Sequence, residues 1–270
     1  MGARIVTSTR RRPRFNDLRI ADVERLTEDS VAITFEVPSD KRGAYAFEPG
    51  QYLTLRRSID GEDVRRSYSI CMSKRSFAST GEIRVASARV HGGAMSNWLY
   101  EHAKIGGSVQ VMTPLGDFTC PTKPELERHH VGIAAGSGIT PVLSMLWTAL
   151  EEEPKSQVTL VLGNRNPDSV MFGEELQWLQ QTYGPRFSLI SAYSRLDTIE
   201  NALRGRIDEV LLNTLLDERL PVADVDEWYV CGPEPMVRAA RRVLVGRGAD
   251  RKHVHQEVFY LEELEEGRGA

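Results

Sequence analysis

The chain has 270 residues and a formal net charge of −4, and 41% of its residues are hydrophobic. This length predicts about two domains, the composition allows a sizeable core, and the mildly acidic balance argues against a nucleic-acid binder. No run of about 18 apolar residues occurs, so we predict no membrane span. We divide the chain into a basic, disordered tail at 1–14, a first domain at 15–124, a second domain at 125–260 and an acidic tail at 261–270.

The N-terminal tail and the cysteines indicate a cytoplasmic protein. The tail holds an arginine run at 10–12 but lacks the apolar stretch that a signal peptide needs. The three cysteines, Cys71, Cys120 and Cys231, are widely separated, and their odd number and scatter predict reduced thiols.

The first domain mostly alternates apolar and polar residues, from Asp17 to about Thr122. Residues 31–37 show the period-two pattern of a half-buried strand. Further strands are expected near 52–55, 65–70, 83–85 and 109–111, and the only helix near 93–103. Many short strands separated by turn residues predict an antiparallel β-barrel.

The strand at 65–70 carries side chains that suit a flavin nucleotide. Alternate side chains of a strand share a face, so Arg66 and Tyr68 point one way and Ser67 and Ser69 the other. Arginine can pair with a phosphate, a tyrosine ring can lie against a flat ring, and Ser69 can reach a polar edge of that ring. The alternative is an ordinary half-buried strand with a solvated arginine.

A turn at Gly92 and Gly93 precedes the predicted helix, which has Met95 and Ser96 in its first turn. Glycines let backbone N–H groups approach a pyrophosphate closely, and a helix N-terminus favours an anion. The sequence therefore predicts a phosphate-binding turn here.

The second domain alternates strands with helices. This order predicts a parallel sheet covered on both faces, with ligands outside the carboxyl ends of its strands, where Gly136, Asn164, Ser194 and Cys231 lie. The strands are expected near 130–135, 157–162, 187–193 and 228–231, and the helices near 140–150, 173–182, 207–216 and 233–245.

The turn after the first of these strands includes Gly136, Gly138, Thr140 and Pro141. Thr140 suits a helix N-cap and Pro141 the first helical position, so this helix N-terminus could receive part of a nicotinamide dinucleotide. The alternative is a tight strand-to-helix turn without a ligand. It is not a Rossmann fingerprint, because proline replaces the third glycine and no acidic residue follows about 20 positions on.

Four motifs in this order resemble those of the ferredoxin–NADP reductase superfamily. The similarity covers residues 15–260 and is closest to oxygenase reductases of the phenylacetyl-CoA epoxidase type. It implies an FAD-binding barrel and an α/β domain that binds NADPH, with NADH as the alternative. The motifs are Arg66-x-Tyr68-Ser69, Gly93-x-x-Ser96, Gly136-x-Gly138-x-Thr140-Pro141 and Cys231-Gly232-Pro233-x-x-Met236.

By this resemblance, Ser69, Thr140, Cys231 and Glu257 serve hydride transfer, and Phe259 covers the flavin ring. Ala88 stands where family members often carry a lysine, so Arg89 is the candidate replacement. The expected cofactor-binding residues are Arg66, Ser67, Tyr68, Ser69, Arg89, Gly92, Gly93, Met95, Ser96, Gly136, Gly138, Thr140, Pro141, Asn164, Arg165, Ser194, Arg195, Cys231, Gly232, Pro233, Met236 and Phe259.

The choice of NADPH over NADH depends on Ser194 and Arg195. This pair resembles the serine and arginine with which NADP-using members bind the 2′-phosphate, and arginine matches phosphate oxygens bidentately. Arg165 is a second candidate for the same phosphate. An acidic partner for an unmodified ribose is missing, which also favours NADPH.

We therefore predict a flavoprotein that passes electrons from NADPH through FAD to an iron–sulfur protein or domain serving an oxygenase. A plant-type cluster needs C-x4-C-x2-C and a fourth cysteine, which this chain lacks, so the partner is expected to be a separate ferredoxin or a missing ferredoxin domain. A flavin reductase that supplies free reduced flavin and a non-catalytic nucleotide-sensing subunit are the alternatives. No metal site is predicted, because the pair His253 and His255 lacks further ligands.

Overall fold

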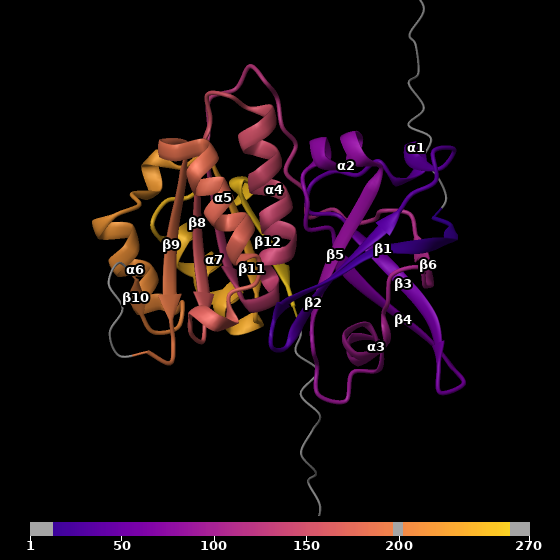
Figure 1. Cartoon of the computed structure of the whole chain (residues 1–270). Coiled ribbons are helices and arrows are strands. Elements are labelled where there is room, and N and C mark those ends of the chain that lie inside the picture. The colour runs from indigo at the N-terminus through magenta and orange to yellow at the C-terminus, as the bar shows by residue number, and fades with distance from the viewer. Residues whose placement is uncertain (1–12, 197–201, 260–270) are drawn as a thin grey trace, which may run out of the picture.

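The computed structural model describes residues 13–196 and 202–259, which form two domains side by side (Figure 1). The tails predicted at 1–14 and 261–270 lie outside the described residues, apart from Pro13 and Arg14, and so does Tyr260. Within the described part of the chain, no helix is long and apolar enough to cross a membrane.

The first domain is a curled antiparallel sheet of six strands in the order β4-β3-β6-β1-β2-β5. A bridge between Ile70 and Val85 brings the end of β4 to β5, so the sheet curls toward closure. The predicted antiparallel barrel architecture is confirmed. The strands are β1 (Phe15–Thr27), β2 (Ser30–Glu36), β3 (Tyr52–Ile59), β4 (Glu62–Ser69), β5 (Glu82–Ala88) and β6 (Ser108–Met112).

The core of this domain follows from the alternation of residues along its strands. Leu18 and Ile20 of β1, Phe35 of β2, and Leu53 and Leu55 of β3 are fully buried. Burying each such side chain contributes about 1.5–3 kcal/mol.

The prediction of a single helix in the first domain is wrong. The expected helix is present as α3 (Ala94–His102), but α1 (Arg42–Tyr45) and α2 (Lys74–Thr80) also form. Helix α2 is too short to show a helical period in the sequence. Ser73 accepts a hydrogen bond from the backbone of Ser76 at its start, and Gly81 ends it in the left-handed conformation.

The second domain is a parallel sheet in the order β10-β9-β8-β7-β11-β12. Helices α4 and α5 pack on one face and α6 and α7 on the other, as predicted (Figure 1). The strands are β7 (His129–Ala135), β8 (Gln157–Asn164), β9 (Phe187–Tyr193), β10 (Leu203–Arg204), β11 (Glu227–Gly232) and β12 (Val254–Val258). The helices are α4 (Ile139–Glu152), α5 (Gly173–Tyr183), α6 (Glu209–Glu218) and α7 (Glu234–Gly246), with 3-10 turns η1 (Gly136–Gly138), η2 (Pro167–Ser169), η3 (Gly184–Arg186), η4 (Val222–Asp224) and η5 (Arg251–His253).

Helix α4 begins earlier than predicted. Because the 3-10 turn η1 leads directly into it, Thr140 and Pro141 are its second and third residues, and Gly138 occupies the N-cap position. The Thr140 hydroxyl donates to the carbonyl of Ser137 at 2.9 Å, inside this turn. The assignment of Thr140 as N-cap and Pro141 as first helical residue is therefore wrong.

Helix α4 also joins the two domains, since it lies between the parallel sheet and the barrel (Figure 1). The Ser144 hydroxyl donates to the carbonyl of Met72 at 2.7 Å, and Thr148 accepts from the backbone of Lys74 at 3.2 Å. These polar residues are buried although they lie outside the apolar stripe that the sequence shows. They are buried because α4 packs against the parallel sheet on one side and against the barrel domain on the other.

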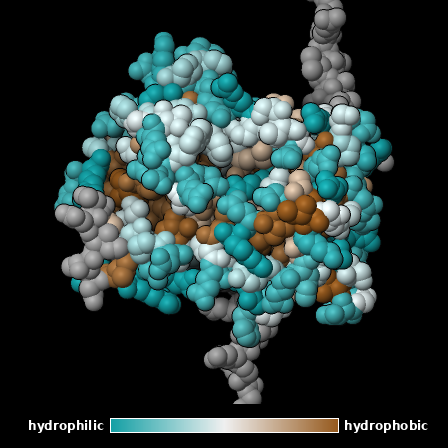
Figure 2. Space-filling model, in the orientation of Figure 1, coloured by the Kyte–Doolittle hydropathy of each residue, from teal (hydrophilic) through white to brown (hydrophobic). Residues whose placement is uncertain are grey.

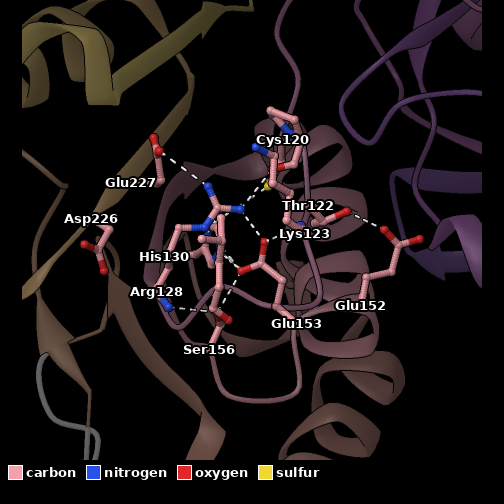
Figure 3. A network of polar contacts seen from close by, with 12 residues as sticks. Cys120, Thr122, Lys123, Arg128, His130, Glu152, Glu153, Ser156, Asp226 and Glu227 are labelled. Atoms are coloured by element: carbon pink, nitrogen blue, oxygen red, sulfur yellow. Dashed lines mark hydrogen bonds and ion pairs between the residues drawn. The ribbon is translucent and has the colours of Figure 1, made fainter.

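A polar network fixes the chain segment between the domains at the amino ends of β7 and β11 (Figure 3). The fully buried carboxylate of Glu153 pairs with Arg128 and bonds His130 at 2.9 Å and the backbone of Lys123 at 2.9 Å. Burial acts to raise the pKa of Glu153, but hydrogen bonds from His130 and Arg128 outweigh it and hold the pKa well below its ordinary value. The charge is thus compensated, as a buried carboxylate requires.

The face of the molecule seen in Figure 1 is mostly hydrophilic. Hydrophobic residues reach this surface in a few separate groups over both domains, each surrounded by hydrophilic ones (Figure 2). Elsewhere the large hydrophobic side chains of the described residues are mainly buried, with Ile105, Trp178 and Val210 as exposed exceptions.

Candidate active site between the two domains

The carboxyl ends of the parallel strands lie at the same lower end of the molecule as α3 and the β1–β2 turn (Figure 1). The turn η1 lies next to both β5 and β11. Ala134 and Cys231, near the ends of β7 and β11, belong to the same buried cluster as Ala32 and Ala86 of the barrel. The strand ends at which open α/β sheets bind their ligands therefore meet the barrel.

Two glycines allow η1 and β11 to touch. A Cβ on Gly138 would lie 2.3 Å from the carbonyl oxygen of Cys231 and 2.8 Å from the Cα of Gly232. Gly232 itself has a φ of 154°, and a Cβ there would lie 2.8 Å from the methyl carbon of Met236. Two of the sequence motifs are thus in direct backbone contact.

Cys231 and Glu257 are register partners on β11 and β12. Burial raises the pKa of the Cys231 thiol well above its ordinary value, and the Glu257 carboxylate acts in the same direction. Burial also raises the pKa of Glu257, to about 7. The thiol therefore stays protonated and is no nucleophile, whereas Glu257 can gain or lose a proton near neutral pH.

Phe259 follows directly after β12. Its backbone N–H donates to the carbonyl of Gly232 at 2.9 Å, and its ring packs against the buried cluster that contains Cys231. Phe259 is thereby held at the edge of the site next to Glu257.

The strand that carries Arg66 ends next to β5, since Ile70 bridges Val85, and β5 in turn lies next to η1. Ser69 is buried at the end of β4, and Tyr68 is half-buried against the barrel core. The Arg66 side chain is exposed, and its guanidinium donates to the carbonyl of Arg65 at 2.9 Å. The Ser67 hydroxyl is 3.1 Å from that of Thr54 on the neighbouring strand.

The start of α3 is a tight turn. Ser96 accepts a hydrogen bond from the backbone of Val90 at 3.2 Å and donates to the carbonyl of Gly93 at 3.2 Å, so its hydroxyl closes the turn. Gly92 has a φ of 73°, and the side chain of Met95 lies in the barrel core. The first N–H groups of a helix have no intrahelical acceptor, so the backbone of this turn fits a pyrophosphate.

Arg89 lies beside α3. Its guanidinium pairs with Glu101 at 2.6 Å, bonds Asn97 at 3.2 Å and stacks over the ring of Tyr100 at 4.6 Å. The side chain is thus held against the helix by three residues.

The carboxyl ends of β8 and β9 bring two arginines together. The backbone N–H of Ser194 donates to the carbonyl of Asn164 at 3.0 Å, and that of Arg195 donates to the carbonyl of Arg165 at 2.9 Å. The Asn164 amide donates to the carbonyl of Ser169 at 2.9 Å. Arg165 and Arg195 therefore stand next to each other at this edge of the sheet.

The expected site residues fall into four groups, according to the elements that carry them and the contacts between these elements. One group is Arg66, Ser67, Tyr68 and Ser69; the second is Arg89, Gly92, Gly93, Met95 and Ser96; the third is Gly136, Gly138, Thr140, Pro141, Cys231, Gly232, Pro233, Met236, Glu257 and Phe259; the fourth is Asn164, Arg165, Ser194 and Arg195.

Sequence reasoning missed the ion pairs that cross the domain boundary. Arg84 of β5, whose side chain is only 15% exposed, lies 2.5 Å from Glu175 of α5 and also pairs with Glu24 of β1. Arg165 lies 2.6 Å from Asp29 in the β1–β2 turn. Their partners are far away in sequence, so no local pattern reveals them.

His253, directly before β12, and His255, within β12, both contact the carboxylate of Glu227. The His253 and His255 rings contact the two oxygens of Glu227 at 3.1 and 2.9 Å. Within residues 13–196 and 202–259, no cluster of three or more potential ligands could hold a metal ion.

Comparison with known proteins agrees with both domains. The family described as oxidoreductase FAD-binding domain matches residues 17–120, and that described as oxidoreductase NAD-binding domain matches residues 133–242. The chain is 41% identical to a subunit of 1,2-phenylacetyl-CoA epoxidase from Escherichia coli, over 91% of this chain and 68% of the relative. It is 34% identical to the ferredoxin reductase component of 3-ketosteroid-9-alpha-monooxygenase from Mycobacterium tuberculosis, over 90% of this chain and 65% of the relative.

Solved structures share the fold. The FAD/NAD-binding domain of nitric oxide dioxygenase from Vibrio cholerae matches with a TM-score of 0.75 and 26% identity, over 90% of this chain and 98% of that chain. A ferredoxin–NADP⁺ reductase from Neisseria gonorrhoeae matches with a TM-score of 0.73 and 19% identity, over 91% of this chain and 99% of that chain.

A curled flavin-binding sheet followed by a parallel nucleotide-binding sheet, with their motifs meeting at one boundary, defines a two-domain oxidoreductase that uses FAD and a nicotinamide dinucleotide. The chain belongs to the ferredoxin–NADP reductase superfamily. The predicted family, enzyme class and pair of cofactors are thereby confirmed.

Proposed function

We propose that this protein is the reductase component of an oxygenase system, which oxidises NADPH and passes electrons through FAD to a ferredoxin-type iron–sulfur partner. The observation that carries the proposal is the backbone contact between Gly138 and Cys231, with Glu257 beside it, where the nucleotide domain meets the barrel. The names of the relatives, one part of an epoxidase and the other a monooxygenase reductase component, support an oxygenase as the final consumer of the electrons.

The barrel, taken as residues 15–124, holds FAD in this proposal. Arg66 is exposed and suits a phosphate, the half-buried face of Tyr68 suits a ring, and the start of α3 offers backbone N–H groups to a pyrophosphate. Bound FAD supplies the conversion from two-electron nicotinamide chemistry to single-electron release.

The nucleotide domain, taken as residues 125–260, positions the nicotinamide. Thr140 and Cys231 line its place at the boundary, and Phe259 covers the adjoining edge. The half-buried Glu257 shields the strand ends from bulk water and holds a proton near neutral pH. Ser69, buried at the end of β4, orients the polar edge of the flavin ring.

The adenosine end is assigned to the fourth group of residues. Arg195 follows β9, and Ser194 lies beside it, which supports recognition of a 2′-phosphate and hence of NADPH. We assign the protein to the cytoplasm because its three cysteines are free, buried thiols.

An anaerobic titration tests the function. The FAD-loaded protein should lose its visible flavin absorbance when NADPH is added and should regain it when an oxidised plant-type ferredoxin follows. Low-temperature EPR should then show reduced cluster only in the ferredoxin. Flavin that stays oxidised with excess NADPH would contradict the reductase assignment, and reduced flavin that leaves the protein on gel filtration would favour a flavin reductase.

A further inference from the structure

The ion pair between Asp29 and Arg165 lies beside the proposed nucleotide site. Arg165 follows β8 in the nucleotide domain, Asp29 belongs to the β1–β2 turn of the barrel, and their side chains approach to 2.6 Å. Both side chains are about half exposed, at 49% and 44%. The pair is therefore accessible to a ligand that arrives at this edge.

Contacts within the barrel domain orient the Asp29 carboxylate independently of Arg165. The Thr27 hydroxyl donates to one carboxylate oxygen at 2.9 Å, which leaves the other for Arg165. The carbonyl of Asp29 accepts from the backbone of Arg89 at 2.7 Å, and the carbonyl of Glu28 accepts from the hydroxyl of Tyr100 at 2.5 Å. The turn is thus fixed against β5 and α3.

Hydrogen bonding keeps this carboxyl ionised. Burial acts to raise the pKa of Asp29, but hydrogen bonds from Thr27 and Arg165 outweigh it, so the pKa is lowered. A negative charge therefore stands at the edge of the sheet where an anionic ligand would bind.

The two neighbouring arginines differ in what they can offer a phosphate. Arg165 already donates to a carboxylate, whereas Arg195 makes no side-chain ion pair within residues 13–196 and 202–259. The Asp29 carboxylate neutralises the Arg165 guanidinium and fixes its direction, and a phosphate that approaches this arginine also meets the like charge of Asp29.

We propose that Asp29 is a specificity-determining residue: by holding Arg165, it leaves recognition of the 2′-phosphate to Arg195 and so weakens the preference for NADPH over NADH. This inference rests on the proposed function, because it requires the adenosine end of the dinucleotide at the carboxyl ends of β8 and β9. A residue of the barrel domain thus influences which dinucleotide the nucleotide domain prefers.

Calorimetric binding of adenosine fragments tests this role without turnover. Asp29→Asn should bind 2′,5′-ADP about three- to tenfold more tightly than the wild type. This gain in affinity lies between the contribution of an exposed ion pair and that of a charge-assisted hydrogen bond. Binding of 5′-AMP, which lacks the 2′-phosphate, should stay unchanged. Adding Arg165→Ala to Asp29→Asn should remove the gain, because the gain depends on the released guanidinium.

Glu28→Gln is the matched control, since it removes one exposed charge from the same turn without touching Arg165. It should leave both affinities unchanged, and a gain equal to that of Asp29→Asn would overturn the inference in favour of a general charge effect. Equal changes for both nucleotides, or none for Asp29→Asn, would overturn it as well. Failure of every protein, wild type included, to bind either nucleotide would instead overturn the proposed nucleotide site and the inference with it.

Discussion

Replacing Gly138 with alanine tests whether the contact between η1 and β11 positions the active site. The new Cβ would lie 2.3 Å from the carbonyl oxygen of Cys231 and 2.6 Å from its carbonyl carbon. Both are backbone atoms, so no side-chain rotation can relieve the clash, and η1 must move by roughly 1 Å to reach an ordinary contact.

This shift should affect both stability and reactivity. Overpacking a well-packed site costs about 1–3 kcal/mol, and each kcal/mol lowers the melting temperature by about 2–4 °C for a protein of this size. A displacement of about 1 Å beside reacting groups can cost about 100-fold in rate. Thermal unfolding and anaerobic stopped-flow reduction of the flavin by NADPH measure the two effects.

Gly173→Ala is the matched control, because Gly173 starts α5 and a Cβ there would meet nothing within 4 Å. It should leave the reduction rate unchanged and the melting temperature equal or slightly higher. A Gly138→Ala protein with the melting temperature and reduction rate of the wild type would refute the positioning role of this contact.

Three further substitutions separate the roles of the remaining groups. Arg66→Ala should weaken FAD by about 1.5–3 kcal/mol, and undiminished flavin absorbance after gel filtration would contradict a phosphate contact. Glu257 binds an extra proton in the folded state between its ordinary value of 4.5 and its raised pKa of about 7, so wild-type stability falls as pH rises through that window. The free energy of unfolding from urea titrations should be higher at pH 5 than at pH 8, and Glu257→Gln should remove about 2–3 kcal/mol of that difference. The same pH dependence in both proteins would contradict the raised pKa of Glu257. Arg195→Ala should weaken NADPH by about 1.5–3 kcal/mol and spare NADH, whereas equal losses would make Arg195 structural.

The sequence was sufficient for the architecture because each strand carries its own pattern. Alternation along β2 and the strand–helix order after Pro124 are local properties, and both predicted sheets formed. Helix α2 escaped prediction because its seven residues show less than two turns of periodicity, and its capping by Ser73 becomes clear only in three dimensions.

The candidate site was predicted less completely, because its details depend on contacts between distant segments. The motif residues could be named, but α4 starts early because the turn η1 leads directly into it, and Gly138 of this turn packs on Cys231, more than 90 residues later. The raised pKa of Glu257 follows from burial, which no residue type encodes. The partner of Arg165 stands 136 residues away, so the sequence could not show that this guanidinium is engaged.

The contacts between the domains differ in strength in a way that suits their positions. The chain segment between the domains is tied to the amino end of β7 by the buried carboxylate of Glu153 (Figure 3). Ser144 and Arg84 add contacts that are largely shielded from water. Removing one partner of the Ser144 hydrogen bond costs about 1–3 kcal/mol, and removing one partner of a buried ion pair such as Arg84–Glu175 costs about 3–5 kcal/mol. These contacts can hold two domains within the roughly 0.5 Å that a shared site needs. The Asp29–Arg165 pair at the ligand-facing edge is half exposed, and such pairs contribute only about 0–1 kcal/mol. A ligand that binds at this edge could therefore rearrange the Asp29–Arg165 pair without disturbing the buried contacts that hold the two domains together.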